Sequence, residues 1–304
     1  MAVRAIPPDQ WQGAQHAHQR RVDAFVRGHL DRAGRGERHP GEDFLFRYYP
    51  LRPGRFRRWH PGPGVGLLPD GDRPTEQAGW RWYTTVRTEA GPAVAVDVRA
   101  FLADRGHTVR ALRDLLAATA SRPPHLACFG LHEWAMVYRL PDGALRHAGW
   151  PLRLGSAACD AVLESQQVRC THFDAFRFFT DQARPRNAVQ PTRTDQLAHE
   201  QPGCLHATMD LYKVAYKLLP AVPSELVADA FDLAREARVL DMRVSPYDVR
   251  PLGYEPLAVE TTQGRAAFVE EQRRVAERGA VLRARLLGAC AALLADAPLA
   301  GVAR

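Results

Sequence analysis

The chain has 304 residues, of which 46% are hydrophobic and 25% are charged, and its formal net charge is +7. These values are ordinary for a globular protein and exclude a disordered chain, a collagen-like repeat and a disulfide scaffold. Lysine occurs only at Lys213 and Lys217, so almost all of the positive charge is arginine. This bias points to a GC-rich genome before it points to an anionic partner.

The ends and cysteines of the chain predict a cytoplasmic protein with no membrane partner. Residues 1–20 contain no apolar run of the kind found in secretory signals, and no stretch of about 18 apolar residues occurs anywhere. The five cysteines are odd in number, widely spaced and without a CxxC pair. We therefore expect reduced thiols.

Apolar periodicity predicts a mainly α-helical fold with a small β element near residues 80–98. Thr108 and Ser224 are the expected N-caps of two helices. Loops are predicted at 61–79, 185–203 and 247–260, and a turn at 142–143, where glycine, proline or aspartate gather. The predicted helices are residues 10–33, 101–104, 109–120, 160–166, 174–182, 204–219, 225–240 and 265–295, and the predicted strands are residues 80–86 and 93–98.

No linker separates two cores, so the sequence predicts one compact domain over residues 1–304. Within it we expect a helix and an arginine–aromatic segment over 1–62, a loop with short strands over 63–100, and a helical core over 101–304.

Four polar residues lie at helical spacing after Gly203. His206, Asp210, Lys213 and Lys217 stand at i, i+4, i+7 and i+11, which places them on one helix face. A histidine and an aspartate one turn apart can form an acid–base pair, and both lysines of the chain stand beside them. The alternative is a solvated face with ordinary Asp–Lys pairing.

Two Cys-x-His units, at Cys170/His172 and Cys204/His206, offer four potential zinc ligands. On a helix, residues i and i+2 diverge by about 200°, which disfavours their joint coordination of one ion. We therefore predict no metal, and no cofactor either, because phosphate-binding and dinucleotide motifs are absent. His172 and Asp174 remain candidates for a polar pocket.

His132 and Glu133 interrupt an apolar run that also contains Trp134. An embedded polar pair is costly unless it is satisfied, so it either lines a cavity or forms a hydrogen-bonded pair in the core. Met136 stands where an HExxH motif needs its second histidine, which excludes that class of zinc protease.

Asp241 follows the predicted helix 225–240, where a carboxylate is unfavourable beside the helix dipole. This position predicts a partner, either Arg243 or a ligand. The same segment ends in Tyr247, which we include among the binding candidates.

Aromatic and arginine residues alternate between residues 44 and 60, and this segment includes Arg58, Trp59 and His60. Stacking rings and guanidinium groups are the chemistry that single-stranded or flipped nucleic acid requires. The alternative is a meander whose rings enter the core while the arginines stay in water.

Several strings together resemble one bacterial family: DFLF at 43–46, RWHPG at 58–62, LHEWAMVY at 131–138, THFDAFRFFT at 171–180, QPGCLHATMDLYK at 201–213 and LDMRVSPYD at 240–248. Proteins of this family are usually described as 3-methyladenine DNA glycosylases. The resemblance, which spans about residues 39–285, implies DNA as a partner and hydrolysis of an N-glycosidic bond in DNA repair. No helix-hairpin-helix motif is recognisable.

Two functions follow from these features. In the first, Asp210, Asp174 or Glu133 is the carboxylate of a DNA glycosylase, and Trp59, Tyr212 or Trp134 forms the walls around an extruded base. In the second, the protein acts in specialised metabolism, either as a tailoring enzyme or as an auxiliary subunit of a partner enzyme. It binds a small molecule in an acid–base pocket. That pocket would combine His206, Asp210, Lys213, His132, Glu133, His172 and Asp174, with Arg243 as an anion-binding group.

Overall fold

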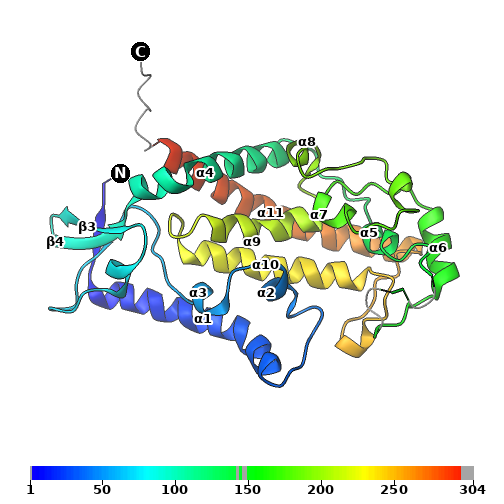
Figure 1. Ribbon diagram of the computed structural model, residues 1–304, viewed down its shortest axis with the longest axis horizontal. Coiled ribbons are helices and arrows are strands. Elements are labelled where there is room, and N and C mark those ends of the chain that lie inside the picture. The colour runs from blue at the N-terminus through cyan, green and yellow to red at the C-terminus, as the bar shows by residue number, and fades with distance from the viewer. Residues whose placement is uncertain (1, 142–143, 146–148, 296–304) are drawn as a thin grey trace, which may run out of the picture. The chain divides into compact units, whose positions relative to one another are not determined.

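A computed structural model describes residues 2–141, 144–145 and 149–295 of the chain, and it confirms a mainly α-helical fold (Figure 1). The turn predicted at 142–143 lies outside the described residues. The helices are α1 Pro8–Gly34, α2 Phe44–Tyr48, α3 Pro53–Phe56, α4 Val98–Ala120, α5 Leu131–Ala135, α6 Ser156–Glu164, α7 Phe173–Phe176, α8 Gln196–His199, α9 Leu205–Lys217, α10 Ser224–Arg243 and α11 Thr262–Ala295.

The small β element is also confirmed, and it is larger than predicted. Strands β3 (Tyr83–Thr88) and β4 (Gly91–Val96) form an antiparallel hairpin. Two more strands, β1 (Arg4–Ile6) and β2 (Val65–Leu67), complete a sheet in the order β1-β2-β4-β3. Each of these has three residues, too few for alternation along the sequence to reveal a strand. The loop predicted at 61–79 therefore contains a strand.

Helix α4 replaces two predicted segments, and its start corrects the predicted cap at Thr108. The helix begins at Val98 because Asp97 precedes it, and the Asp97 carboxylate accepts a hydrogen bond from the N–H of Ala100 at 2.9 Å. Thr108 lies inside the helix. Ser224 does begin α10, and its hydroxyl group accepts a hydrogen bond from the N–H of His60.

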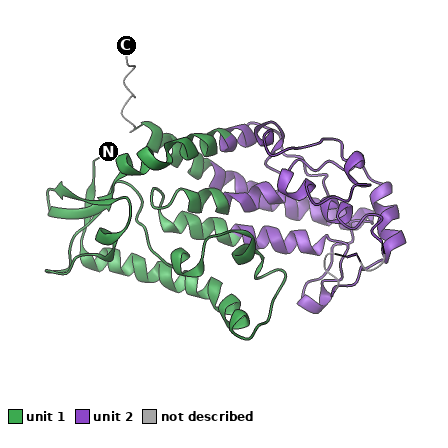
Figure 2. Ribbon diagram, viewed as in Figure 1, with its two compact units in different colours: residues 1–114, 212–232, 284–304 green, residues 115–211, 233–283 purple. Residues whose placement is uncertain are grey.

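The chain divides into two compact units (Figure 2). Unit 1 comprises residues 1–114, 212–232 and 284–304, and unit 2 comprises residues 115–211 and 233–283. Helices α4, α9, α10 and α11 contribute to both units, because the unit boundaries fall within them. The single folding domain stays a prediction.

Aromatic rings form much of the core of unit 1. Phe56 lies at the centre of this cluster, with its ring centroid 5.1 Å from that of Phe231 and 5.8 Å from that of Tyr212. Phe25 and Phe46 pack on the same Phe231 ring, each at 5.1 Å. Such aromatic pairs add to the free energy gained by burying apolar area. The rings of the arginine–aromatic segment thus enter the core.

The cysteines have the state that the sequence predicts. All five cysteines are free thiols. No helix within the described ranges combines the length and the apolar character that a bilayer crossing requires.

A buried carboxylate holds the end of α1 to the loop before α2. Asp43 accepts hydrogen bonds from Arg32 at 2.7 Å and from the N–H of His39 at 2.7 Å, and it contacts His29 at 3.0 Å. Burial by itself would raise the pKa of Asp43, but these donors outweigh it and lower the pKa from 3.8 to about 2.

This lowered pKa predicts how stability depends on pH. The contribution of Asp43 is complete above its unfolded pKa and is lost as the pH falls from about 4 to 2, and it amounts to about 2 kcal/mol. We expect Asp43→Asn to lower the free energy of unfolding at pH 7 by about that amount and to flatten its acid limb. Urea denaturation across pH measures both. The control is Glu42→Gln, which removes an exposed ion pair to Arg32 worth about 0–1 kcal/mol; equal losses for the two variants would contradict the assignment.

Candidate metal centre

Helix α5 carries the first histidine of the site, and its start is tightly packed. Gly130, the residue before the helix, has a left-handed backbone with φ of 65°. A Cβ atom at Gly130 would lie 2.2 Å from Cγ2 of Val244. The indole of Trp134 donates a hydrogen bond to the carbonyl of Val244 at 2.8 Å. The hydrogen bond holds α5 against the segment that follows α10, and the lack of a side chain at Gly130 allows the two segments to approach so closely.

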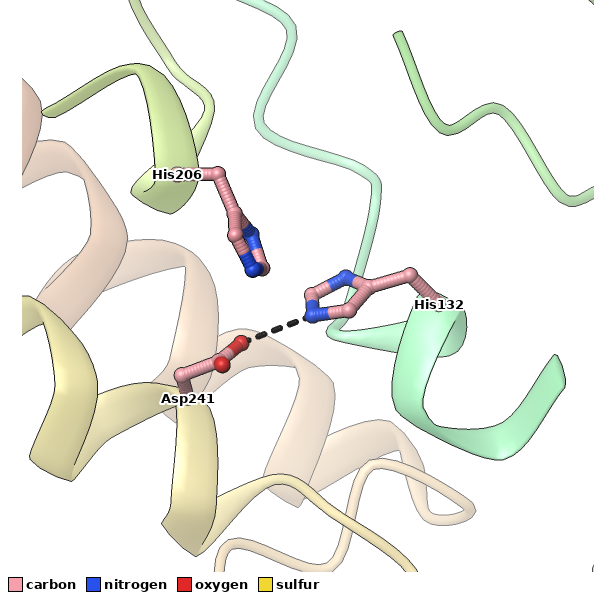
Figure 3. Close-up of side chains that lie close together, drawn as sticks. All are labelled: His132, His206 and Asp241. Carbon is pink, nitrogen blue, oxygen red and sulfur yellow. Dashed lines mark ion pairs between the residues drawn. The ribbon is translucent and has the colours of Figure 1, made fainter. Parts of the chain in front are cut away.

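His132 of α5, His206 of α9 and Asp241 of α10 point toward one another (Figure 3). Their ligand atoms all lie within 4.8 Å of each other. The ring centroids of His132 and His206 are 4.7 Å apart, and Nε2 of His132 lies 2.9 Å from Oδ1 of Asp241. We call this group set A. Its three side chains come from three separate helices.

The closest contact of set A does not have hydrogen-bond geometry. Nε2 of His132 and Oδ1 of Asp241 are buried, and neither has a hydrogen-bond partner among the described residues. Two ligand atoms that each lie about 2.1 Å from one metal ion, at right angles, are separated by about 3.0 Å. The observed separation of 2.9 Å is that of an ion pair and is also close to the separation expected for two ligand atoms of one ion.

A second group, set B, contains His172, Glu200 and Asp210, all of which are buried. Nε2 of His172 lies 3.3 Å from Oε1 of Glu200 and 3.4 Å from Oδ2 of Asp210. The contact between His172 and Asp210 is a long hydrogen bond, and both separations also match neighbouring ligands of a tetrahedral ion, which are about 3.4 Å apart.

The two sets are neighbours within unit 2. His206 of set A is tilted against His172 of set B with 5.3 Å between ring centroids. His206 and Asp210 stand one turn apart on α9, so one helix supplies a ligand to each set. Six imidazole and carboxylate groups therefore gather in one place.

Arg238 fixes the orientation of the Asp241 carboxylate. Its NH1 group lies 2.9 Å from Oδ2 of Asp241 and 3.3 Å from Oε1 of Glu133. The other oxygen of Asp241 is thereby left for set A. Partners of this kind behind a ligating carboxylate orient it and tune its basicity.

Burial and neighbouring charges shift the pKa values of the site in different directions. Burial lowers the pKa of His206 to about 3, so this ring is neutral and keeps a free lone pair. Burial also disfavours the charged forms of His132 and Asp241, but their mutual attraction outweighs it, raising the pKa of His132 and lowering that of Asp241. The pKa of Glu133 is raised by burial and by the charge of Asp241. The neutral ring of His206 and the ionised carboxylate of Asp241 are forms that bind metal, whereas at His132 a metal ion would have to displace the proton that the raised pKa favours.

A small cavity adjoins set A. It encloses about 20 Å³ and is lined by His132, His206 and three cysteines, Cys128, Cys170 and Cys204. One water molecule needs about 10–15 Å³ of such space. Burial raises the pKa of all three thiols, that of Cys170 to about 12, so they are protonated and form an apolar wall. The cysteines of the two Cys-x-His units are outside both ligand sets.

The structure brings together five of the residues singled out in the sequence: His132, His172, His206, Asp210 and Asp241. It adds Glu200, which sequence reasoning missed because it lay in a predicted loop. The available signal was its position directly before the string QPGCLHATMD. Glu200 is only 3% exposed, although it lies in a loop just after the short helix α8.

Other candidates in unit 2 occupy structural positions. Asp174 pairs with Arg177 at 3.1 Å. Trp134 is buried, and its indole donates its hydrogen bond to the carbonyl of Val244. Arg243 donates a hydrogen bond to the carbonyl of Glu255 at 2.9 Å rather than to Asp241. Tyr247 is buried, and its backbone forms a bridge with Leu152.

The remaining candidates belong to unit 1. Lys213 lies on α9 beyond the boundary of unit 2, and Tyr212 belongs to the aromatic core. Trp59 is 4% exposed, packs in a cluster with Trp11, and donates a hydrogen bond to Glu225 at 2.8 Å. Arg58 is exposed and His60 is buried.

Comparison of the chain with models of protein families, with curated proteins and with solved structures finds no match.

The close approach at Gly130 predicts that Gly130→Ala is severely destabilising. A methyl group here meets Val244 and forces a left-handed backbone on an L-residue, which together cost about 2–4 kcal/mol in free energy of unfolding. Chemical denaturation measures this loss. Gly149→Ala is the matched control, because nothing lies within 4 Å of a Cβ atom there; a loss of less than about 1 kcal/mol at Gly130 would refute the packing described.

Proposed function

We propose that this protein is a metal-dependent enzyme for a small-molecule substrate, with one first-row divalent ion in set A and a second in set B. The observation that carries the proposal is the convergence of His132, His206 and Asp241 beside His172, Glu200 and Asp210 in the interior of unit 2. Buried charges are costly unless they are paired or bind metal.

The ligand types narrow the choice of metal. Imidazole and carboxylate suit Zn²⁺, Fe²⁺ and Mn²⁺, whereas Cu⁺ prefers the thiolate ligands that neither set contains. Set A has two histidines and one carboxylate, a combination that leaves coordination positions open for water or substrate. The small cavity beside His132 and His206 supports an open position on that side.

Two adjacent ions would account for the presence of three imidazoles and three carboxylates in one place. Two such ions, held by these side chains, would supply Lewis-acid chemistry toward a substrate and activate water near neutral pH. Arg238 and Glu133 would keep Asp241 directed at its ion, as the hydrogen bonds of Arg238 indicate.

The DNA glycosylase activity implied by the family resemblance is the competing proposal. It requires a carboxylate with access to an extruded base, and Asp210 is the remaining candidate, since Asp174 pairs with Arg177 and Glu133 with Arg238. This reaction needs no metal. Release of 3-methyladenine from alkylated duplex DNA by chelator-treated protein would favour it over the metal-dependent enzyme.

Metal analysis of the purified full-length protein tests the proposal. We expect about two equivalents of a first-row metal per chain, measured by inductively coupled plasma mass spectrometry after reconstitution. Asp241→Asn should reduce the content to about one equivalent, and the double variant with Asp210→Asn to none. Asp174→Asn is the control with full content, because Asp174 belongs to neither set.

Two results would contradict a metal centre. One is wild-type protein that takes up no metal; the other is full metal content in the double variant. A thermal scan adds an independent readout, because an ion that binds only the folded protein raises its melting temperature, and a chelator removes that increase.

The contact between Arg238 and Asp241 predicts that Arg238 affects metal affinity without binding the metal itself. Arg238→Ala should weaken metal affinity about 10–100-fold by freeing the Asp241 carboxylate, and Arg238→Lys should restore part of it. Competition with a chromophoric chelator measures the affinity. Arg177→Ala is the control, since its ion pair with Asp174 lies outside both sets. Unchanged affinity in Arg238→Ala would remove this residue from the site.

A further inference from the structure

Unit 1 contains a second pocket, whose lining residues all belong to that unit. It encloses about 460 Å³, within the range of about 300–1,000 Å³ that small-molecule sites occupy. Its walls come from the segment around α3, the residues before β3, helix α4 and the end of α9. None of the six ligand residues of sets A and B lines it.

The pocket is strongly cationic. Arg55, Arg58, Arg81, Arg105 and Lys217 line it, and no aspartate or glutamate does. Lys217 is one of only two lysines in the chain. Cations gathered in a concavity repel one another and focus a positive potential, which favours binding of an anion.

Most of the arginines that line the pocket have no carboxylate partner, unlike other arginines of unit 1. Arg57, next in sequence to Arg58 and outside the pocket, pairs with Asp23 at 2.8 Å. Arg81 pairs with Asp104 at the same distance. Among the described residues, Arg55, Arg58 and Arg105 have no carboxylate within ion-pair distance, and the buried Nε of Arg105 has no hydrogen-bond partner.

Aromatic rings form the other part of the lining. Trp80, Trp82 and Tyr216 contribute rings, and His60 contributes an imidazole whose pKa burial lowers to about 3, so it adds no charge. The Arg58 guanidinium lies 5.1 Å from the Trp80 ring, and that of Arg81 lies 4.4 Å from the Trp82 ring. Two of the guanidinium groups therefore lie against tryptophan rings of the lining, and sites that hold a phosphate and a stacked base combine the same two kinds of group.

We propose that this pocket binds a phosphorylated ligand with a planar ring, the chemistry of a nucleotide. The guanidinium groups of Arg55 and Arg58 would receive the phosphate, and the tryptophan rings would stack on the base. An inorganic anion would leave the ring walls unused, and a neutral aromatic molecule would leave the charges of Arg55, Arg58 and Arg105 uncompensated. The nucleotide can be free or form the unpaired end of a nucleic-acid strand.

Calorimetric titration of the full-length protein tests this pocket with three probes: inorganic phosphate, adenosine 5′-monophosphate and single-stranded oligothymidylate. We expect the mononucleotide to bind at least about tenfold more tightly than phosphate, since stacking of one base contributes about 1–3 kcal/mol. Arg58→Ala should weaken nucleotide binding at least about tenfold through a lost charge-assisted contact. Arg57→Ala, which changes the adjacent arginine outside the pocket, should bind like the wild type.

The three probes also distinguish the two sources of the nucleotide. Oligothymidylate binding at least about tenfold tighter than the mononucleotide, with steep salt dependence, identifies a strand end. Equal or weaker binding identifies a free nucleotide. No binding of any probe at about 1 mM, equal affinity for phosphate and mononucleotide, or wild-type affinity in Arg58→Ala would overturn the proposal. Metal content measured on the same variants should be unchanged, so this result is independent of sets A and B.

Discussion

Burying carboxylates and imidazoles inside unit 2 is the constraint on which the rest of the site depends. Asp241 is fully buried and Glu200 is 3% exposed, and a buried charge without compensation costs several kcal/mol. Arg238 compensates one oxygen of Asp241, and the histidines face the other. The groups are held by separate helices, so their convergence is built into the packing of α5, α9 and α10. A metal ion in each set would complete that compensation.

Unit 1 buries aromatic rings while it keeps neighbouring guanidinium groups in water. Phe56 and Trp59 are buried, while Arg57 and Arg58 between them are exposed. This arrangement separates the two halves of the arginine–aromatic segment: the rings stabilise the core, and the guanidinium groups remain on the surface. The rings that line the basic pocket are a different group, led by Trp80 and Trp82. The segment therefore contributes Arg55, Arg58 and the imidazole of His60 to that pocket, while other elements contribute its tryptophan rings.

The sequence predicted long elements well and short ones badly, for a physical reason. Helices such as α1 and α11 carry many turns of apolar periodicity, whereas β1 and β2 have three residues each and exist through pairing with partners far along the chain. Thr108 illustrates a local error, because Asp97 provides an earlier helix start with its own carboxylate cap. Among the site residues, His206 and Asp210 shared a visible helical spacing, whereas Glu200 had no periodic neighbourhood to mark it.

By itself, the sequence determined the helical class, the free thiols and the unusual polar residues embedded in apolar stretches, because these follow from composition and local periodicity. Only the tertiary structure decided which of those residues meet. His132, His172 and His206 are far apart in sequence, and their convergence depends on how helices pack, which no local pattern encodes. The same packing placed Arg238 behind Asp241 and left Arg243 bonded to a backbone carbonyl. Local pattern therefore selected five of the six residues, and long-range packing added Glu200 and sorted them into sets A and B.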